Sequence, residues 1–305
     1  HTLLKGGNKI LKSNLNNYFV MENNFDLHKN QILVSCSFFL TKTDSIRRQN
    51  KYIDGLKQLY EWTNKNKYIL RIYYDNSVEN IINQNYQKND VQLFKYHFTD
   101  LFDNKLNKHF GTLGTLFRFL PLFDFENHYH NMVLVSDIDT SGDKDISSNF
   151  ISYIDLYLNL SIKNNNDLLL ISKYMYKFRN RFLYTDNPNN YPYLACIIFS
   201  NNMKALNINI FLNFFNKYFI DNESISHFNN NFQYGIDEYF LNNYMFNDQK
   251  FNSLNHIKLV FFEKHIKHQI LEKIPLNQNI NSDINNLLKN KDYENNVKKI
   301  TNIVT

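Results

Sequence analysis

Short apolar runs alternate with longer segments of helical periodicity along the first half of this chain. Apolar residues recur at helical spacing over 45–66, directly after a Thr43-Asp44-Ser45 cluster suited to begin a helix. We place further helices at 111–123, 148–160, 208–220 and 235–246. The short apolar runs predict strands at 32–40, 68–74, 132–135, 168–174, 194–200 and 258–262, and alternating apolar and polar side chains predict another at 91–98.

The order of these elements predicts an α/β fold. A strand, a helix and a strand come first, which favours a sheet that is parallel in its first half, and the later order favours a mixed second half with flanking helices. The 305 residues include only 7 glycines and 4 prolines, so the chain lacks the glycine- and proline-rich linkers expected between several domains. We therefore expect one domain over 31–275, an N-terminal extension over 1–30 and a polar C-terminal tail over 276–305.

The charge and composition of the chain limit the kinds of ligand and the cellular location that we expect. The net charge of +5 is scattered, which suits a site for an anionic small molecule and argues against a nucleic-acid partner, since that would need a concentrated basic stripe. Cys36 and Cys196 lie in apolar runs and are expected to be buried, reduced thiols. No apolar run or signal-peptide region is long enough for a membrane span or a leader. We expect a cytoplasmic location, which is the host cytoplasm if the asparagine-rich composition reflects a viral, AT-rich genome.

The sharpest motif is the apolar strand beginning at Met132 that stops at Ser136-Asp137-Ile138-Asp139. Ligands of open α/β sheets bind beyond the carboxyl ends of the strands, and carboxylate oxygens there favour Mn²⁺ or Mg²⁺ shared with a substrate diphosphate. An acidic turn capped by Asp139 or Thr140 would give the same pattern. Asp137 also superficially resembles the nucleophile of haloacid-dehalogenase phosphatases, although three predicted strands precede it here.

The segment 112–123, with Arg118 and Pro121, followed by 132–139, resembles the core of GT-A-fold glycosyltransferases. It is most similar to the glycogenin and lipopolysaccharide galactosyltransferase group, in which a helix bearing an arginine leads into an apolar strand and an Asp-x-Asp motif. The polar exit of the first strand, Val34 to Thr41, is similar in kind, and the resemblance covers roughly 32–140. It implies a GT-A-like, Rossmann-like fold and transfer of a hexose, with retention of configuration, from a nucleotide-diphosphate sugar such as a UDP-sugar to a glycan or protein hydroxyl.

The resemblance also implies roles for individual residues. Asp137 and Asp139 would bind the metal and the diphosphate, and Arg118 would lie near the sugar nucleotide, although a solvent-facing helix arginine is an equal alternative. His265 is a candidate third metal ligand, but the glycine and Lys-Pro-Trp pattern expected beside it is absent. The base and ribose would rest at the exits of the first two strands, near Thr41, Arg47, Tyr74 and Asp75.

A second carboxylate pair, Asp237-Glu238, begins the predicted helix at 235–246 and resembles the acidic helix start beside the acceptor in that group. A carboxylate there could orient an acceptor hydroxyl or act as general base, and we favour Asp237 for this catalytic role. Acidic residues in a first helical turn also complement the helix dipole without any catalytic function. His128 and His130 precede the strand at its far end from the aspartates and are expected to be solvated.

Three function classes therefore remain open. A metal-dependent glycosyltransferase accounts for most of the motifs, a phosphatase using Asp137 comes next, and a non-catalytic nucleotide-sugar-binding module is the third. The absence of a Gly-x-Ser-x-Gly elbow and of a phosphate-binding Gly-x-x-x-x-Gly-Lys loop disfavours serine hydrolases and ordinary NTPases.

Overall fold

The computed structural model describes residues 19–21, 31–40, 44–86, 91–97, 110–125, 130, 132–138, 168–174, 197–201, 206–220, 235–245 and 256–262. Its strands are β1 (Phe19–Met21), β2 (Leu33–Phe38), β3 (Ile69–Tyr74), β4 (Val91–Tyr96), β5 (Met132–Ser136), β6 (Leu168–Tyr174), β7 (Ile197–Asn201) and β8 (His256–Phe262). Its helices are α2 (Ile46–Asn66), α3 (Glu79–Asn85), α4 (Phe110–Phe117), α6 (Ile208–Phe215) and α7 (Ile236–Phe240). Short turns extend three of them: the 3₁₀ turn Leu120–Leu122 and the π-helical turns Asn216–Ile220 and Leu241–Met245.

The strands form one mixed sheet in the order β1-β4-β3-β2-β5-β7-β6-β8. The strands β4, β3, β2 and β5 are parallel neighbours, whereas β7 runs antiparallel to both β5 and β6. β6 and β8 pair in parallel, and β1 pairs antiparallel with β4 at the edge. The predicted α/β class, with a Rossmann-like parallel first half and a mixed second half, is therefore confirmed.

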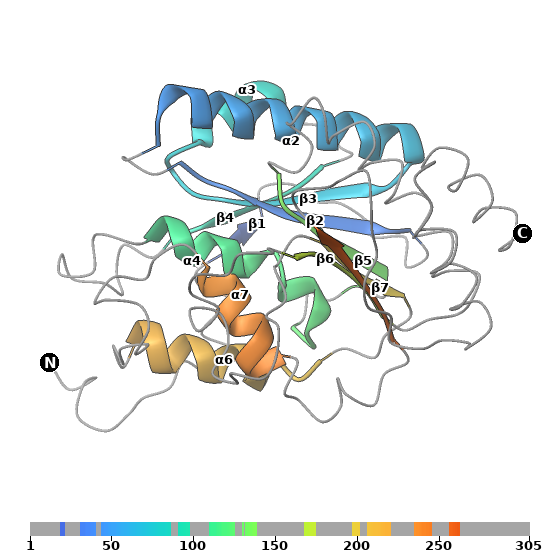
Figure 1. Ribbon diagram of the computed structural model, residues 1–305. Coiled ribbons are helices and arrows are strands. Elements are labelled where there is room, and N and C mark those ends of the chain that lie inside the picture. Colours follow the sequence, from blue (N-terminus) through green and yellow to red (C-terminus); the bar gives the residue numbers. More distant parts are fainter. Residues whose placement is uncertain are drawn as a thin grey trace, which may run out of the picture.

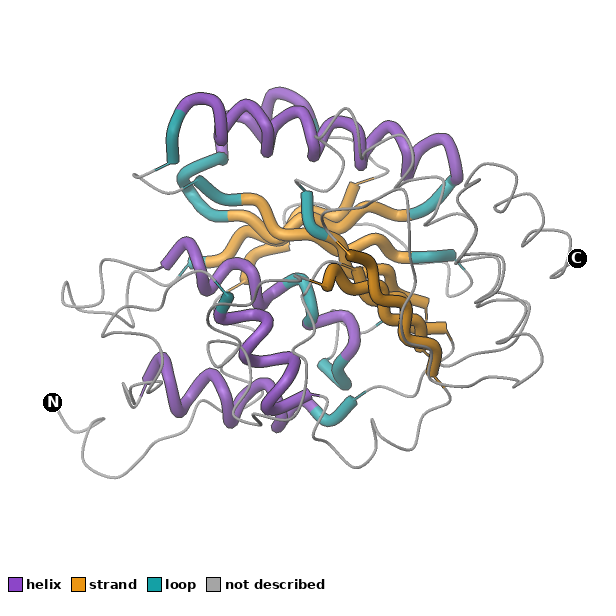
Figure 2. Tube along the Cα trace, in the orientation of Figure 1, coloured by secondary structure: helices purple, strands orange, loops and turns teal. Residues whose placement is uncertain are grey.

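Helices cover both faces of the sheet (Figures 1 and 2). α2 and α3 lie over one face, and α4, α6 and α7 lie over the other. The central strands β2 and β3 are buried along their whole length, as the continuous apolar runs predicted. α2 begins where predicted because the Ser45 side chain accepts a hydrogen bond from the Arg48 N–H, and Leu56, Leu59 and Trp62 form its buried face.

The core between the sheet and α4, α6 and α7 is unusually aromatic. Phe240 of α7 lies at its centre, with ring centroids 5.0 Å from Phe214, 5.7 Å from Phe211 and 6.2 Å from Phe119. Such contacts add to the free energy gained by burying the rings. They fix α7 against α4 and the 3₁₀ turn, which places the residues at the start of α7 beside the end of α4.

Close packing also sets the position of α4 on the sheet. Gly114, on the inner side of α4, leaves no room for a side chain: a Cβ atom there would overlap the Tyr96 hydroxyl and the Phe39 ring. The glycine therefore lets α4 approach β2 and β4 closely.

Most elements begin and end within a few residues of their predicted bounds. The strand β1 and the helix α3 were missed; β1 falls within the segment expected to be an irregular extension. Cys36 is buried with a free thiol, as predicted. Cys196, the helix predicted at 148–160 and the tail at 276–305 lie outside the described residues, and the domain bounds stay predictions. Within the described part of the chain, no helix is long and apolar enough to cross a membrane.

Candidate functional site

The sheet has a topological switch point at β2. From β2 the chain continues through α2 to β3 on one side, and after β4 it crosses through α4 to β5 on the other side. Ligands of open α/β sheets bind beyond the carboxyl ends of the two strands at such a point. Asp137 directly follows β5, so the structure places it at the edge where a ligand is expected.

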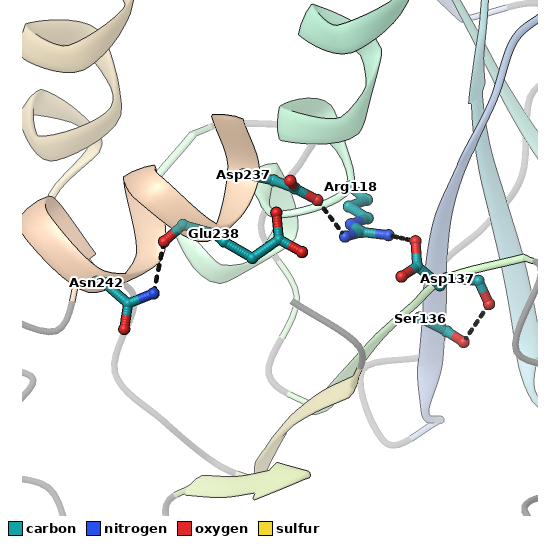
Figure 3. A network of polar contacts seen from close by, with 6 residues as sticks. All are labelled: Arg118, Ser136, Asp137, Asp237, Glu238 and Asn242. Carbon is teal, nitrogen blue, oxygen red and sulfur yellow. Dashed lines mark hydrogen bonds and ion pairs between the residues drawn. The ribbon is translucent and has the colours of Figure 1, made fainter. Parts of the chain in front are cut away.

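Arg118 lies between two aspartates that are distant in the sequence (Figure 3). Its Nη1 forms an ion pair with Asp137 Oδ1, and its Nη2 donates a hydrogen bond of 2.6 Å to Asp237 Oδ2. Arg118 is only 2% exposed, so the solvent-facing alternative is wrong. A guanidinium can bridge two carboxylates in this way because its donors point in several fixed directions.

A hydrogen bond from a side chain of β2 fixes the backbone at Arg118. The hydroxyl of Ser35, fully buried in the middle of that strand, donates a hydrogen bond of 2.8 Å to the Arg118 carbonyl oxygen. This bond satisfies one of the carbonyls that a helix end leaves free. Ser35 was not among the predicted site residues. A hydroxyl inside an otherwise apolar strand was the available signal.

The second aspartate comes from the start of α7. Gly235 precedes the helix with φ of 107°, a left-handed conformation that favours glycine, and turns the chain into the helix. Asp237 and Glu238 occupy the first turn, and both side chains point toward Arg118 (Figure 3). The side chain of Asn242, one helical turn after Glu238, donates a hydrogen bond of 2.7 Å to the Glu238 carbonyl oxygen.

The two carboxyls of α7 differ in their electrostatic state. Burial alone would lower the pKa of Arg118, but Asp137 and Asp237 raise it above its ordinary value, so the guanidinium stays charged. Burial, followed by the neighbouring charge of Asp237, raises the pKa of Glu238 well above its ordinary value. Glu238 is half-buried as a residue, yet its Oε2 is enclosed and makes no hydrogen bond. Asp237 is therefore the ion-pair partner, while Glu238 favours its neutral form.

Glu238→Gln is expected to stabilise the protein at pH 8 and to change little at pH 4.5. The folded protein holds the Glu238 proton more tightly than the unfolded chain does. The stability that the neutral carboxyl contributes is therefore fully present below the pKa of Glu238 in the unfolded chain. It is lost as the pH rises through the pKa of Glu238 in the folded protein. Glutamine keeps the neutral form at every pH, and we expect Tm at pH 8 to rise by about 2–6 °C. Thermal melts at the two pH values measure this. Glu61→Gln, at an exposed position on α2, is the control and should shift Tm similarly at both.

Three other predicted residues lie near this edge without joining the cluster. Tyr74 ends β3 and is fully buried, and by strand alternation it faces α2 and α3 rather than Arg118. Asp75 accepts hydrogen bonds from the Ser77 N–H and hydroxyl, and Ser77 in turn accepts from the Leu40 N–H. Burial raises the pKa of Asp75. Arg47 is exposed in the first turn of α2.

Thr41, Asp139 and His265 lie outside the described residues. The roles predicted for these residues, and for Arg47, Tyr74 and Asp75, stay predictions.

His130 corrects an expectation. It is 5% exposed rather than solvated, and its Nδ1 lies 3.1 Å from the Met132 carbonyl oxygen. Burial, with the nearby Arg71 charge, lowers the pKa of His130 to about 4, so the ring is neutral at neutral pH. His130 precedes β5 and Asp137 follows it, so the two residues lie at opposite ends of the strand, as predicted.

The oxygen chemistry of the site fits a hard divalent cation in part. Asp137 presents a carboxylate whose side chain is 36% exposed at a strand end, which is the donor type that Mn²⁺ and Mg²⁺ prefer. Among the described residues, no group of three or more potential metal-ligating side chains occurs. A complete site would therefore draw on ligands such as Asp139, beyond the described part of this strand end.

Comparison with known proteins adds little to this geometry. No protein-family profile matches the chain, and no curated protein matches it in sequence. The solved structures similar to it include 4-diphosphocytidyl-2C-methyl-D-erythritol synthase from Anaerococcus prevotii, with a TM-score of 0.37 and 10% identity over 90% of this chain and 99% of that one. Residues 1–349 of S. aureus TarS give a TM-score of 0.31 and 14% identity over 69% of this chain and 53% of that one. Similarities at this level establish neither family nor activity, and the fold assignment rests on the sheet topology.

Proposed function

We propose that this chain is a metal-dependent glycosyltransferase that moves a hexose from a nucleotide-diphosphate sugar to a hydroxyl of a glycan or protein acceptor. One observation carries the proposal: the buried Arg118 joins Asp137, at the switch-point end of β5, to the Asp237-Glu238 pair of α7. Two of the residues predicted for the donor, Asp137 and Arg118, thus belong to one charge cluster with Asp237, which was predicted for the acceptor.

The cluster has a charge balance suited to a diphosphate leaving group. With Glu238 neutral, Arg118 and the two aspartates carry a net charge of −1 between them; Asp139 would add a further −1, and a divalent cation would bring the total to zero. Asp137, with Asp139, would hold such a cation, which would stabilise the negative charge that develops on the leaving diphosphate. Arg118 holds the Asp137 carboxylate in place from the protein side.

Residues of α7 would act on the acceptor hydroxyl. As the bond between the sugar C1 and the diphosphate oxygen breaks, the bonding electrons leave with the diphosphate, and the acceptor oxygen forms the new bond to C1. The acceptor hydroxyl must lose its proton, and the Asp237-Glu238 pair, which holds one proton, can take up a second. Arg118 orients Asp237, the carboxylate that we favour as the group accepting this proton.

Donor cleavage tests this proposal directly. The protein is incubated with UDP-glucose, UDP-galactose, UDP-N-acetylglucosamine and GDP-mannose, each with Mn²⁺ or with EDTA, and the released nucleoside diphosphate is quantified. We expect metal-dependent release from one donor. Phosphate release from p-nitrophenyl phosphate, without release of a nucleoside diphosphate, would instead favour the phosphatase. Binding of a nucleotide sugar with neither activity would favour the binding module.

A further inference from the structure

The hydroxyl of Ser37, near the carboxyl end of β2, makes no hydrogen bond in this structure. Ser37 is 8% exposed, and its Oγ is enclosed. Ser35, two residues earlier, has a similar hydroxyl that donates to the Arg118 carbonyl oxygen. Because side chains alternate along a strand, Ser35 and Ser37 face the same side of the sheet, toward α4 and Arg118.

Strand register places Ser37 beside the site. In the parallel pair of β2 and β5, Leu33 is paired with Val133 and Ser35 with Val135. The last pair of this register is that of Ser35 and Val135, and Asp137 follows the end of β5. Continuing the register by two residues, we expect Ser37 to lie near Asp137, on the Arg118 side of the sheet, because paired residues of neighbouring strands point to the same face.

An enclosed hydroxyl without a partner lowers the stability of the fold, because its hydrogen bonds to water are lost and no protein group replaces them. Buried polar groups are almost always paired, so each exception calls for a reason, and ligand-binding sites are a common one. The Oε2 of Glu238 is another enclosed oxygen without a hydrogen bond, and it belongs to the same cluster around Arg118. Two unbonded polar atoms thus lie next to one set of ion pairs.

We propose that the Ser37 hydroxyl binds an oxygen of the sugar-diphosphate part of the donor. This inference rests on the proposed function. Its expected position opposite Asp137, the residue proposed to bind the cation shared with the diphosphate, favours this part of the donor over the base.

The test compares Ser37→Ala with Ser35→Ala. Affinity for UDP, for the UDP-sugar selected by the donor test and for uridine is measured by calorimetry with Mn²⁺ present, and Tm is measured without ligand. For Ser37→Ala we expect an unchanged or slightly higher Tm, because the lost hydroxyl had no partner, and a weaker affinity for UDP-sugar by roughly five- to tenfold. Ser35→Ala, which removes a bonded hydroxyl from the same strand face, should lower Tm.

The outcomes separate the two proposals. A loss for UDP and UDP-sugar alike indicates a phosphate oxygen, and a loss for UDP-sugar alone indicates a sugar hydroxyl; both support the inference. If Ser37→Ala binds UDP-sugar as tightly as the unmodified protein does, or loses affinity for uridine to the same extent, the inference is overturned while the proposed function stands. If the unmodified protein binds neither UDP, GDP nor any nucleotide sugar of the donor test with Mn²⁺ present, both proposals are overturned.

Discussion

Arg118→Met is expected to lower the free energy of unfolding by about 3–5 kcal/mol, the range typical for removing one partner of a buried ion pair. Methionine has a similar length and no charge, so it leaves Asp237 buried opposite no cation and close to Glu238. Asp137 is affected less, because its side chain is 36% exposed to water. Denaturant unfolding measures the change, and nucleotide binding should be lost with it.

Arg48→Met is the matched control. Arg48 also forms an ion pair with an aspartate, Asp44, at 3.5 Å, but its side chain is 46% exposed on α2. The Asp44 side chain is 7% exposed, but water solvates the exposed Arg48 guanidinium, so the pair contributes about 1 kcal/mol or less and this variant should remain close to the unmodified protein. Equal effects of the two substitutions would mean that the Arg118 bridge does not hold α7 to the end of β5.

Asp137→Asn is expected to weaken metal-dependent nucleotide binding by roughly 100-fold or more, because it removes a charged ligand for the cation from the strand end. The substitution keeps the size of the side chain, and its amide oxygen can still accept a hydrogen bond from Arg118. We therefore expect a much smaller loss of stability than in Arg118→Met. Calorimetric titration of UDP with Mn²⁺ and with EDTA measures the binding effect.

Asp124→Asn separates binding from folding. The Asp124 carboxylate accepts a hydrogen bond of 2.6 Å from the Ile208 N–H and so caps the start of α6. Asparagine keeps an acceptor oxygen for this bond and loses only the negative charge beside the helix start, so stability should fall by at most about 1 kcal/mol and nucleotide affinity should not change. If Asp137→Asn bound UDP and Mn²⁺ as this control does, the strand-end carboxylate would have no part in binding.

The sequence was most informative where local patterns determine structure. The strands β2, β3 and β5 were predictable because buried parallel strands form continuous apolar runs, and α2 because its cap and its periodic face agree. The strand β1 was missed because three residues are too short a window for any periodicity. The helix α3 was missed because it buries little of its surface and its start has no side-chain cap.

The site was only partly predictable from the sequence. Asp137, Arg118 and Asp237 were singled out by motif and by resemblance, but their contact was not predictable, because Arg118 and Asp237 lie 119 positions apart and meet only through the packing of α7 on α4. The role of Ser35 depends in the same way on a partner 83 positions away. His130 was expected to be solvated because its neighbours are polar, yet the fold encloses it.

Calorimetric titration of the unmodified protein with UDP and GDP, each in the presence of Mn²⁺ and of EDTA, tests the central claim most directly. We expect one nucleoside diphosphate to bind with Mn²⁺ and EDTA to abolish or strongly weaken this binding, since Asp137 and the diphosphate would share the cation. Absence of heat from both nucleotides with Mn²⁺ present, from a protein shown by its melting transition to be folded, would contradict the claim.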